Sequence, residues 1–159
     1  MGTSTLFLLI RLGDDRYAID ADIVVEVVPL VRLKALPGAP AGAAGVMTFR
    51  GDAIPVVDLN LIALGTPTAP RLMTRIVVVR YAGADGDDAS APLGLLVPEV
   101  MHAEHFEESQ FEPVGLATDD APYLGPVLST PDGVLQRVRI SALLTPELRC
   151  ALFRREVAA

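Results

Sequence analysis

Residues 45–59 read GVMTFRGDAIPVVDL, in which two apolar runs flank Arg50, Gly51 and Asp52. A Gly-Asp pair between apolar runs predicts a β-hairpin, because glycine readily takes the positive φ that a tight turn needs. The strand after the turn supplies apolar side chains for a core, and its Pro55 is tolerated where the nitrogen faces away from the ladder or lies at an edge. Burial in a core does not explain Arg50, which lies between the two expected strands.

Two roles for Arg50 are open: pairing with a nearby carboxylate and direct contact with a partner, since paired arginines are also frequent interface anchors. Glu26 is the natural carboxylate, because a charge within an apolar strand needs compensation and that strand can lie beside the 45–59 hairpin. If the pair is exposed it stabilises the fold by only about 0 to 1 kcal/mol, so its value would be orientation. Val24 is typical of a core side chain.

Further turn signals occur on both sides of this hairpin. The expected hairpins are 6–11 with 16–20, 46–49 with 53–58, and 123–128 with 134–140. Many short strands separated by turns predict an all-β barrel architecture with minor helices. Because 53–64 and 134–144 both read as a strand followed by a short helix, two similar small barrels are favoured over one large one.

Local patterns predict the remaining segments. The expectations are a buried strand over 21–31, an irregular loop over 36–45, helical turns over 59–64 ended by Gly65, an exposed mobile loop over 82–92, little regular structure over 101–120, a short turn capped by Ser141, and a C-terminal helix over 145–159. The last helix is predicted from Thr145, Pro146 and Glu147, which supply a capping hydroxyl, a first-turn proline and a carboxylate near the positive end of the helix dipole.

Composition narrows the class of protein. The chain has 159 residues, 51% of them hydrophobic, and a formal net charge of −7, which argues against nucleic-acid binding because phosphate binding needs a basic face. Its single cysteine, Cys150, allows no internal disulfide and suits a reducing cytosol. The opening apolar run 6–10 is too short for a membrane span and lacks a basic leader. A cytoplasmic protein with a protein partner is expected.

The residues offer little for catalysis. His102 and His105 lie near several glutamates, but no other histidine or cysteine ligand is available nearby, so a metal site is disfavoured. No serine lies in a strained nucleophile turn, and no set of base, nucleophile and orienting group can be argued. We therefore expect no enzyme activity, no catalytic residue, no metal and no cofactor.

The 45–59 stretch resembles the signature of CheW-like domains, in which a glycine and an apolar pair lead into an Asn-x-Arg-Gly turn and an apolar strand ending in Asp-Leu. The surroundings that resemble the family are the Leu12-Gly13-Asp14 turn, Tyr17 to Asp20, Val24-x-Glu26-Val27, Leu36-Pro37, and Gly94 to Val97 followed by Glu99-Val100. The resemblance covers roughly residues 6–144. Thr48 stands in the usual Asn place, and Arg137 and Arg139 interrupt a strand that is normally strongly apolar, so the chain is similar to a divergent member.

The resemblance implies a mainly β fold of two small intertwined five-stranded SH3-like barrels with short helices and a C-terminal helix. These would form one domain over 1–159, with lobes at 16–80 and at 1–15 plus 81–144. For Arg137 and Arg139, two apart on one strand face, solvation is favoured over an acidic partner surface.

The function implied is a non-catalytic adaptor that couples the regulatory domain of a CheA-type histidine kinase to the cytoplasmic hairpin tip of a chemoreceptor-type protein, and that is recruited to membrane receptor arrays. Val24, Glu26 and Arg50 resemble positions on the receptor-facing surface of the family. Two alternatives remain: a CheW-like module of a non-flagellar chemosensory pathway that does not engage the kinase, and a small metal-dependent enzyme using His102 and His105.

Overall fold

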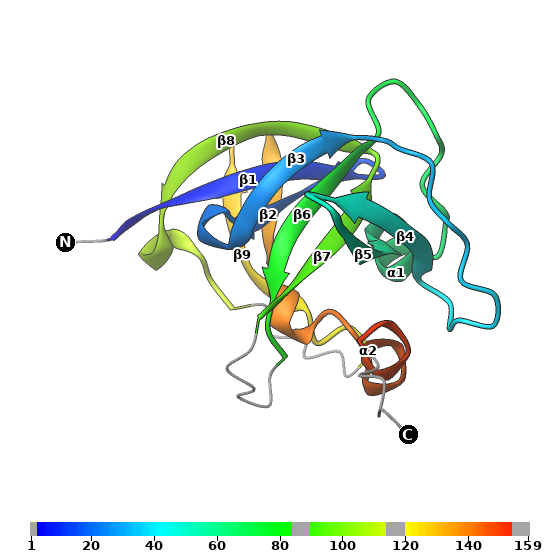
Figure 1. Ribbon diagram of the computed structural model, residues 1–159. Coiled ribbons are helices and arrows are strands. Elements are labelled where there is room, and N and C mark those ends of the chain that lie inside the picture. The colour runs from blue at the N-terminus through cyan, green and yellow to red at the C-terminus, as the bar shows by residue number, and fades with distance from the viewer. Residues whose placement is uncertain (1–2, 84–89, 114–119, 154–159) are drawn as a thin grey trace.

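The computed structural model describes residues 3–83, 90–113 and 120–153, and within these ranges ten strands form two five-stranded sheets (Figure 1). Sheet A has the order β8-β1-β2-β10-β9, with β1 at Ser4–Leu12, β2 at Asp15–Asp20, β8 at Glu99–Glu107, β9 at Leu124–Thr130 and β10 at Gly133–Val138. Sheet B has the order β3-β6-β7-β5-β4, with β3 at Val24–Pro29, β4 at Ala43–Phe49, β5 at Asp52–Asp58, β6 at Arg75–Tyr81 and β7 at Ala91–Val97. The mainly β class and the two five-stranded units are confirmed.

Short helices connect and close the sheets. They are the 3-10 turns η1 at Ala21–Ile23, η2 at Glu108–Gln110 and η3 at Ile140–Ala142, and the α-helices α1 at Leu59–Leu64 and α2 at Pro146–Leu152. α2 begins as the sequence predicts, because the Thr145 hydroxyl accepts a hydrogen bond from the Leu148 N–H at 3.1 Å. α1 ends at Gly65, also as predicted. No helix of the described ranges is long and apolar enough to cross a membrane.

The two sheets repeat one topology. In sheet A the β1-β2 hairpin pairs in parallel with β10, which pairs with β9; in sheet B the β6-β7 hairpin pairs in parallel with β5, which pairs with β4. The edge strands are exchanged: β3 follows the sheet A hairpin but joins sheet B, and β8 follows the sheet B hairpin but joins sheet A. In Figure 1, β8 and β3 accordingly arch over the same side of the molecule.

Both faces of the inner strands are buried. The largest cluster of buried side chains draws on both sheets, with Ile10, Val77 and Leu95 among its members, all fully buried. Each sheet also has a core of its own, around Phe7 in sheet A and Ile54 in sheet B. Because alternate residues of a strand face opposite sides, an inner strand needs a continuous apolar run, which is what the sequence shows at 6–10 and 76–79.

The sheet boundaries differ from the expected lobes. β2 pairs with β1 and β10, although residues 16–20 were expected in the lobe at 16–80. β7 pairs with β6 and β5, although residues 91–97 were expected in the other lobe. Hairpin partners stay together in each sheet, and the chain crosses between sheets after each hairpin rather than within it.

Several local expectations are wrong because strand position depends on tertiary pairing. The 21–31 segment was expected to be a buried strand, but β3 is an edge strand whose Glu26, Val27 and Pro29 are exposed. The 101–120 segment was expected to lack regular structure, but β8 continues to Glu107 as an edge strand with mostly exposed side chains, which explains its missing apolar pattern. Ser141 lies inside η3 and does not cap it.

Parts of three expectations lie outside the described residues. They concern 84–89 in the expected loop over 82–92, 114–119 in the segment over 101–120, and 154–159 in the expected C-terminal helix over 145–159. β7 begins at Ala91, within the segment expected to be a loop.

Candidate partner-binding surface

The hairpin between β4 and β5 turns through two residues, Arg50 and Gly51. Phe49 pairs with Asp52 across the turn, and φ is 51° at Arg50 and 86° at Gly51. A two-residue turn with positive φ at both positions is the type that matches the twist of the strands, and Asn-Gly is its usual sequence. Arg50 is the one non-glycine with a positive φ among the described residues, a conformation that costs roughly 1 to 2 kcal/mol. The turn therefore tolerates strain in order to carry an arginine.

Glu26 is brought to this turn from the opposite edge of sheet B. Its Oε2 lies 3.6 Å from the Nη2 of Arg50, and the two side chains are 45% and 66% exposed. The pairing of Glu26 with Arg50 expected from the sequence is therefore observed. Such an exposed pair contributes only about 0 to 1 kcal/mol, so it orients the guanidinium more than it stabilises the fold.

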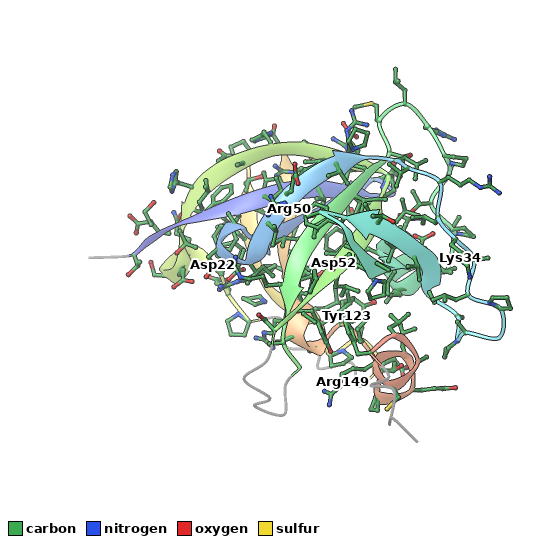
Figure 2. All side chains as sticks on the ribbon, in the orientation of Figure 1. Asp22, Lys34, Arg50, Asp52, Tyr123 and Arg149 are labelled. Carbon is green, nitrogen blue, oxygen red and sulfur yellow. The ribbon has the colours of Figure 1, made fainter. Side chains whose placement is uncertain are left out.

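The backbone around the hairpin leaves little freedom. Lys34 and Val46 exchange two backbone hydrogen bonds of 2.8 and 2.9 Å, which extend the outer edge of β4 with the chain that follows β3. A Cβ at Gly45 would lie 2.5 Å from the Lys34 carbonyl oxygen, so only glycine fits there. In Figure 2 Arg50 lies at the end of β4 beside β3, whereas Lys34 lies at the other end of that hairpin.

The Arg50 guanidinium also lies over an aromatic ring. Its Cζ is 4.9 Å from the centroid of the Phe49 ring, within the range of a cation–π contact. The ring and Glu26 together hold one face and one edge of the guanidinium, while two thirds of the side chain stays open to solvent. The group is positioned and still available to a carboxylate or carbonyl of another molecule.

Val24 lies on β3 but does not share the exposed face of Glu26. A β-bulge between Val24 and Glu26 inserts Val25, which shifts the register with β6. Val24 is half-buried and packs against the core shared by the two sheets, whereas Val25 packs against the core of sheet B. The prediction that Val24 is a core residue therefore agrees with its packing. The part of Val24 that stays exposed is separated from Glu26 by the bulge at Val25.

His102 and His105 do not come together as a site. Both lie on β8, opposite Leu9 and Leu6 of β1, and residues three apart on a strand point to opposite faces. The Nε2 of His102 lies 3.1 Å from a carboxylate oxygen of Glu104 on the exposed surface. Among the residues that the structure describes, no group of three or more His, Cys, Asp or Glu side chains could hold a metal ion.

Arg137 is bound by carboxylates rather than solvated, so the solvated interpretation is wrong for this residue. Its Nε and Nη2 donate to the two carboxylate oxygens of Asp20 at 2.9 and 2.6 Å, and Nη2 also donates to Glu108 at 3.2 Å. The hydrogen bonds that Arg137 donates to Asp20 raise the pKa of Arg137 despite its partial burial. Arg139, by contrast, is exposed.

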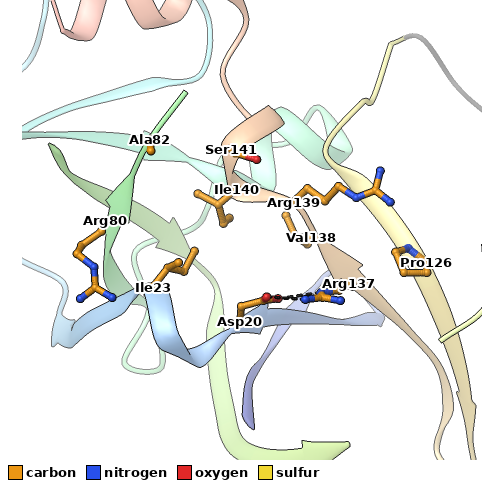
Figure 3. A pocket seen from close by; sticks show the side chains of 10 residues that line it. All are labelled: Asp20, Ile23, Arg80, Ala82, Pro126, Arg137, Val138, Arg139, Ile140 and Ser141. Carbon is orange, nitrogen blue, oxygen red and sulfur yellow. Dashed lines mark hydrogen bonds and ion pairs between the residues drawn. The ribbon is translucent and has the colours of Figure 1, made fainter. Parts of the chain in front are cut away.

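A cavity of about 410 Å³ opens beside this pair, as Figure 3 shows. Arg80 and Arg139 lie at opposite sides of it, with Ile23 and Ile140 between them. Asp20 bridges to Arg137 across the parallel β2-β10 pair, so this ion pair ties sheet A together. The cavity presents no nucleophile with an adjacent base, and the arrangement is structural.

Sequence reasoning missed the exposed apolar side chains near Glu26. Val27 and Val31 are 37% and 42% exposed, and Leu72 and Met73 in the loop before β6 are 92% and 54% exposed. In the sequence, Leu72 and Met73 stand out only as two adjacent apolar residues between Arg71 and Arg75, in a segment without a strand or helix pattern.

Comparison with known proteins agrees with this geometry. The family model described as the CheW-like domain matches residues 6–147. A crystal structure of the scaffolding protein TtCheW from Thermoanaerobacter tengcongensis has the same fold, with a TM-score of 0.78 and 23% sequence identity over 93% of this chain and 92% of that one. The exchanged five-stranded sheets, the Arg-Gly turn and the family match over most of its length show that this chain belongs to the CheW-like domain family.

Proposed function

We propose that this chain is a non-catalytic adaptor that couples a CheA-type histidine kinase to a chemoreceptor-type protein on the cytoplasmic side of a receptor array. The observation that carries the proposal is Arg50, an exposed arginine held by Glu26 at a strained turn. Membership in the CheW-like family supports it, as does the likeness of the fold to a protein described as a scaffold.

The energetics of the turn favour a binding role for Arg50. The positive φ costs roughly 1 to 2 kcal/mol, and the exposed ion pair returns at most about 1 kcal/mol. A residue that is retained at such a cost without a comparable gain in stability is typical of a functional site. We therefore assign Arg50 to direct contact with the receptor-type partner, Glu26 to its orientation, and Val24 to the apolar margin of the same contact.

The described residues offer no competing chemistry. No cluster of metal ligands is found among them, and the ion pair between Asp20 and Arg137 joins strands β2 and β10. The proposal needs no cofactor.

The proposal is tested by binding measurements with two purified probes, a kinase regulatory domain and a receptor cytoplasmic hairpin fragment. Isothermal titration should show that the chain binds both. Arg50→Glu should lower the affinity for the hairpin at least tenfold, leave the affinity for the kinase domain within twofold, and keep the circular dichroism spectrum unchanged. The matched control is Arg11→Glu, because Arg11 also forms an ion pair, with Glu99 at 3.3 Å in sheet A, and its side chain is 41% exposed.

The charge-swapped variant Glu26→Arg/Arg50→Glu separates orientation from contact. It restores an ion pair at the turn with reversed polarity, so the fold and the pair survive. If Arg50 contacts the partner, hairpin binding stays lost in the swapped variant. Recovery of binding would show that only the pair matters, and failure of the wild-type chain to retain either probe would end the adaptor proposal. Retention of the hairpin alone would favour the module that does not engage the kinase.

A further inference from the structure

The loop that enters β6 presents two apolar side chains to solvent. We call residues 71–75 the tip; within it Leu72 is 92% exposed and Met73 is 54% exposed. Single exposed apolar residues are common on protein surfaces, but an adjacent pair at the end of a protruding loop is typical of a contact site. In Figure 1 this loop extends well beyond the sheets, next to the end of β3.

The tip is held rigidly although it is exposed. Thr74 is 1% exposed, and its hydroxyl donates to the Ala69 carbonyl at 2.7 Å and accepts from the Arg71 N–H at 3.0 Å. The Arg75 guanidinium donates to the Leu72 and Thr74 carbonyls at 2.7 and 2.9 Å. These bonds fix the backbone on both sides of Leu72 and Met73.

A buried carboxylate anchors the base of the same loop. Asp58 is 6% exposed and accepts hydrogen bonds from the Leu61 N–H, the Thr68 N–H and the Thr68 hydroxyl at 3.1, 2.8 and 2.6 Å. A loop ordered before binding loses less conformational entropy on binding than a mobile one. The exposure of the tip is therefore a preorganised feature of the fold.

The charge around the tip indicates what it binds. Residues 59–81 contain no Asp or Glu, although the chain carries a net charge of −7, and they include Arg71 and Arg75 at the tip. Neither arginine has a carboxylate partner among the described residues. A partner that is apolar at its centre and carries carboxylates at its margin is complementary to such a surface.

The tip lies at the end of β3, the edge strand that carries Glu26. Arg75 pairs with Pro29 at the end of β3, which is three residues, or about 10 Å, from Glu26. Val27 and Pro29 are exposed on the side of β3 opposite to Glu26, because neighbouring residues of a strand point to opposite sides. An α-helix rises about 1.5 Å per residue, so positions i and i+7 on one helix face are about 10.5 Å apart. One helix laid along the edge strand β3 can therefore span the distance from Glu26 to the tip.

We propose that Leu72 and Met73 are a second anchor for the helical partner that contacts Arg50, and that this partner is an amphipathic helix bearing carboxylates beside its apolar stripe. The assignment rests on the proposed adaptor function, with the receptor-type hairpin as the helix. Arg50 and Glu26 give the polar end of the contact, and the tip gives its apolar end.

The test is titration of the purified receptor cytoplasmic hairpin fragment into the full chain. Leu72→Ser/Met73→Ser removes the apolar side chains at exposed positions, so the fold should be retained, and circular dichroism and the melting temperature check this. The affinity for the hairpin should fall at least tenfold. Val134→Ser is the matched control, because Val134 is an apolar side chain on β10 of sheet A that is 57% exposed. The affinity of this variant for the hairpin should stay within twofold of the wild-type value. Arg71→Gln should weaken binding and reduce its dependence on salt.

Each other outcome decides against the proposal. Unchanged hairpin affinity of the double variant, with wild-type binding intact, would overturn the tip assignment and leave the adaptor function standing. A loss confined to the kinase regulatory domain would place a different partner on the tip and overturn it as well. If the wild-type chain does not bind the hairpin at all, both the adaptor function and the tip assignment fall.

Discussion

Replacing Arg50 by Asn separates the backbone strain at the turn from the binding role proposed for the arginine side chain. Asn takes positive φ readily and is the usual residue at this turn position, so the substitution should recover most of the roughly 1 to 2 kcal/mol of backbone strain. It removes the pair with Glu26, which is worth about 0 to 1 kcal/mol, and the contact with the Phe49 ring, which is worth about 0.5 to 1 kcal/mol at an exposed site. The 3.6 Å separation and the 66% exposure of Arg50 favour the low end of the ion-pair range.

The gain and the losses nearly cancel. We expect the free energy of unfolding of Arg50→Asn to lie within about 1 kcal/mol of the wild-type value, which is a shift in Tm of no more than about 4 °C for a chain of this size. Urea denaturation followed by circular dichroism measures the first quantity and a thermal scan the second. Over the same range of conditions, affinity for the receptor hairpin fragment should fall at least tenfold.

Two results would refute this reasoning. A loss of more than about 2 kcal/mol would show that the contacts of Arg50 outweigh the strain, which would make the residue structural. Unchanged hairpin affinity in a folded variant would show that the turn arginine is not a contact. Arg11→Gln in sheet A is the control for removal of a partly exposed arginine that forms an ion pair, because Arg11 has no positive φ and so no such backbone strain to release.

Three further predictions concern the fold. Leu95→Ala should lower the free energy of unfolding by about 2 to 5 kcal/mol in urea denaturation, because Leu95 is fully buried in the core shared by the sheets; a loss below about 1 kcal/mol would contradict that placement. Burial raises the pKa of Tyr17 and Tyr123 above the ordinary 10.0, and Asp15 adds to the shift at Tyr17. The unfolded chain therefore releases these protons first, and the free energy of unfolding should fall as pH rises above about 10. Replacing both tyrosines by Phe should make the midpoint of urea denaturation depend less on pH in this range, and an unchanged dependence would refute the reasoning. Asp58→Ala leaves three donors without their acceptor and should cost about 1 to 3 kcal/mol and speed tryptic cleavage in the 59–75 loop, whereas an unchanged cleavage rate would show that the anchor is dispensable.

Local chemistry was enough to predict the features that depend on near neighbours in the chain. The Arg50-Gly51 turn, the end of α1 at Gly65 and the start of α2 at Thr145 each rest on the conformational preference of one or two residues. Glu26 was also named as the partner of Arg50 from its charge within an apolar run, although the strand is exposed and it is the tertiary structure that brings the two side chains together.

Pairing between distant strands decided what local pattern could not. β3 reads as apolar but lies at an edge, and β8 reads as irregular yet is a nine-residue strand. Whether a strand is central or at an edge depends on which other strands pair with it, and no short-range pattern records that. The Arg137–Asp20 pair joins residues 117 positions apart for the same reason.

The sequence by itself determined the β class, the three hairpins and an arginine placed in a turn, because turn chemistry and alternation of side chains act over a few residues. Only the tertiary structure decided the exchange of β3 and β8 between the sheets, which puts Glu26 beside Arg50 and the 71–75 tip at the end of the same strand. The physical reason is that an edge strand gains its hydrogen bonds from whichever sheet it reaches, and that choice depends on how the whole chain packs.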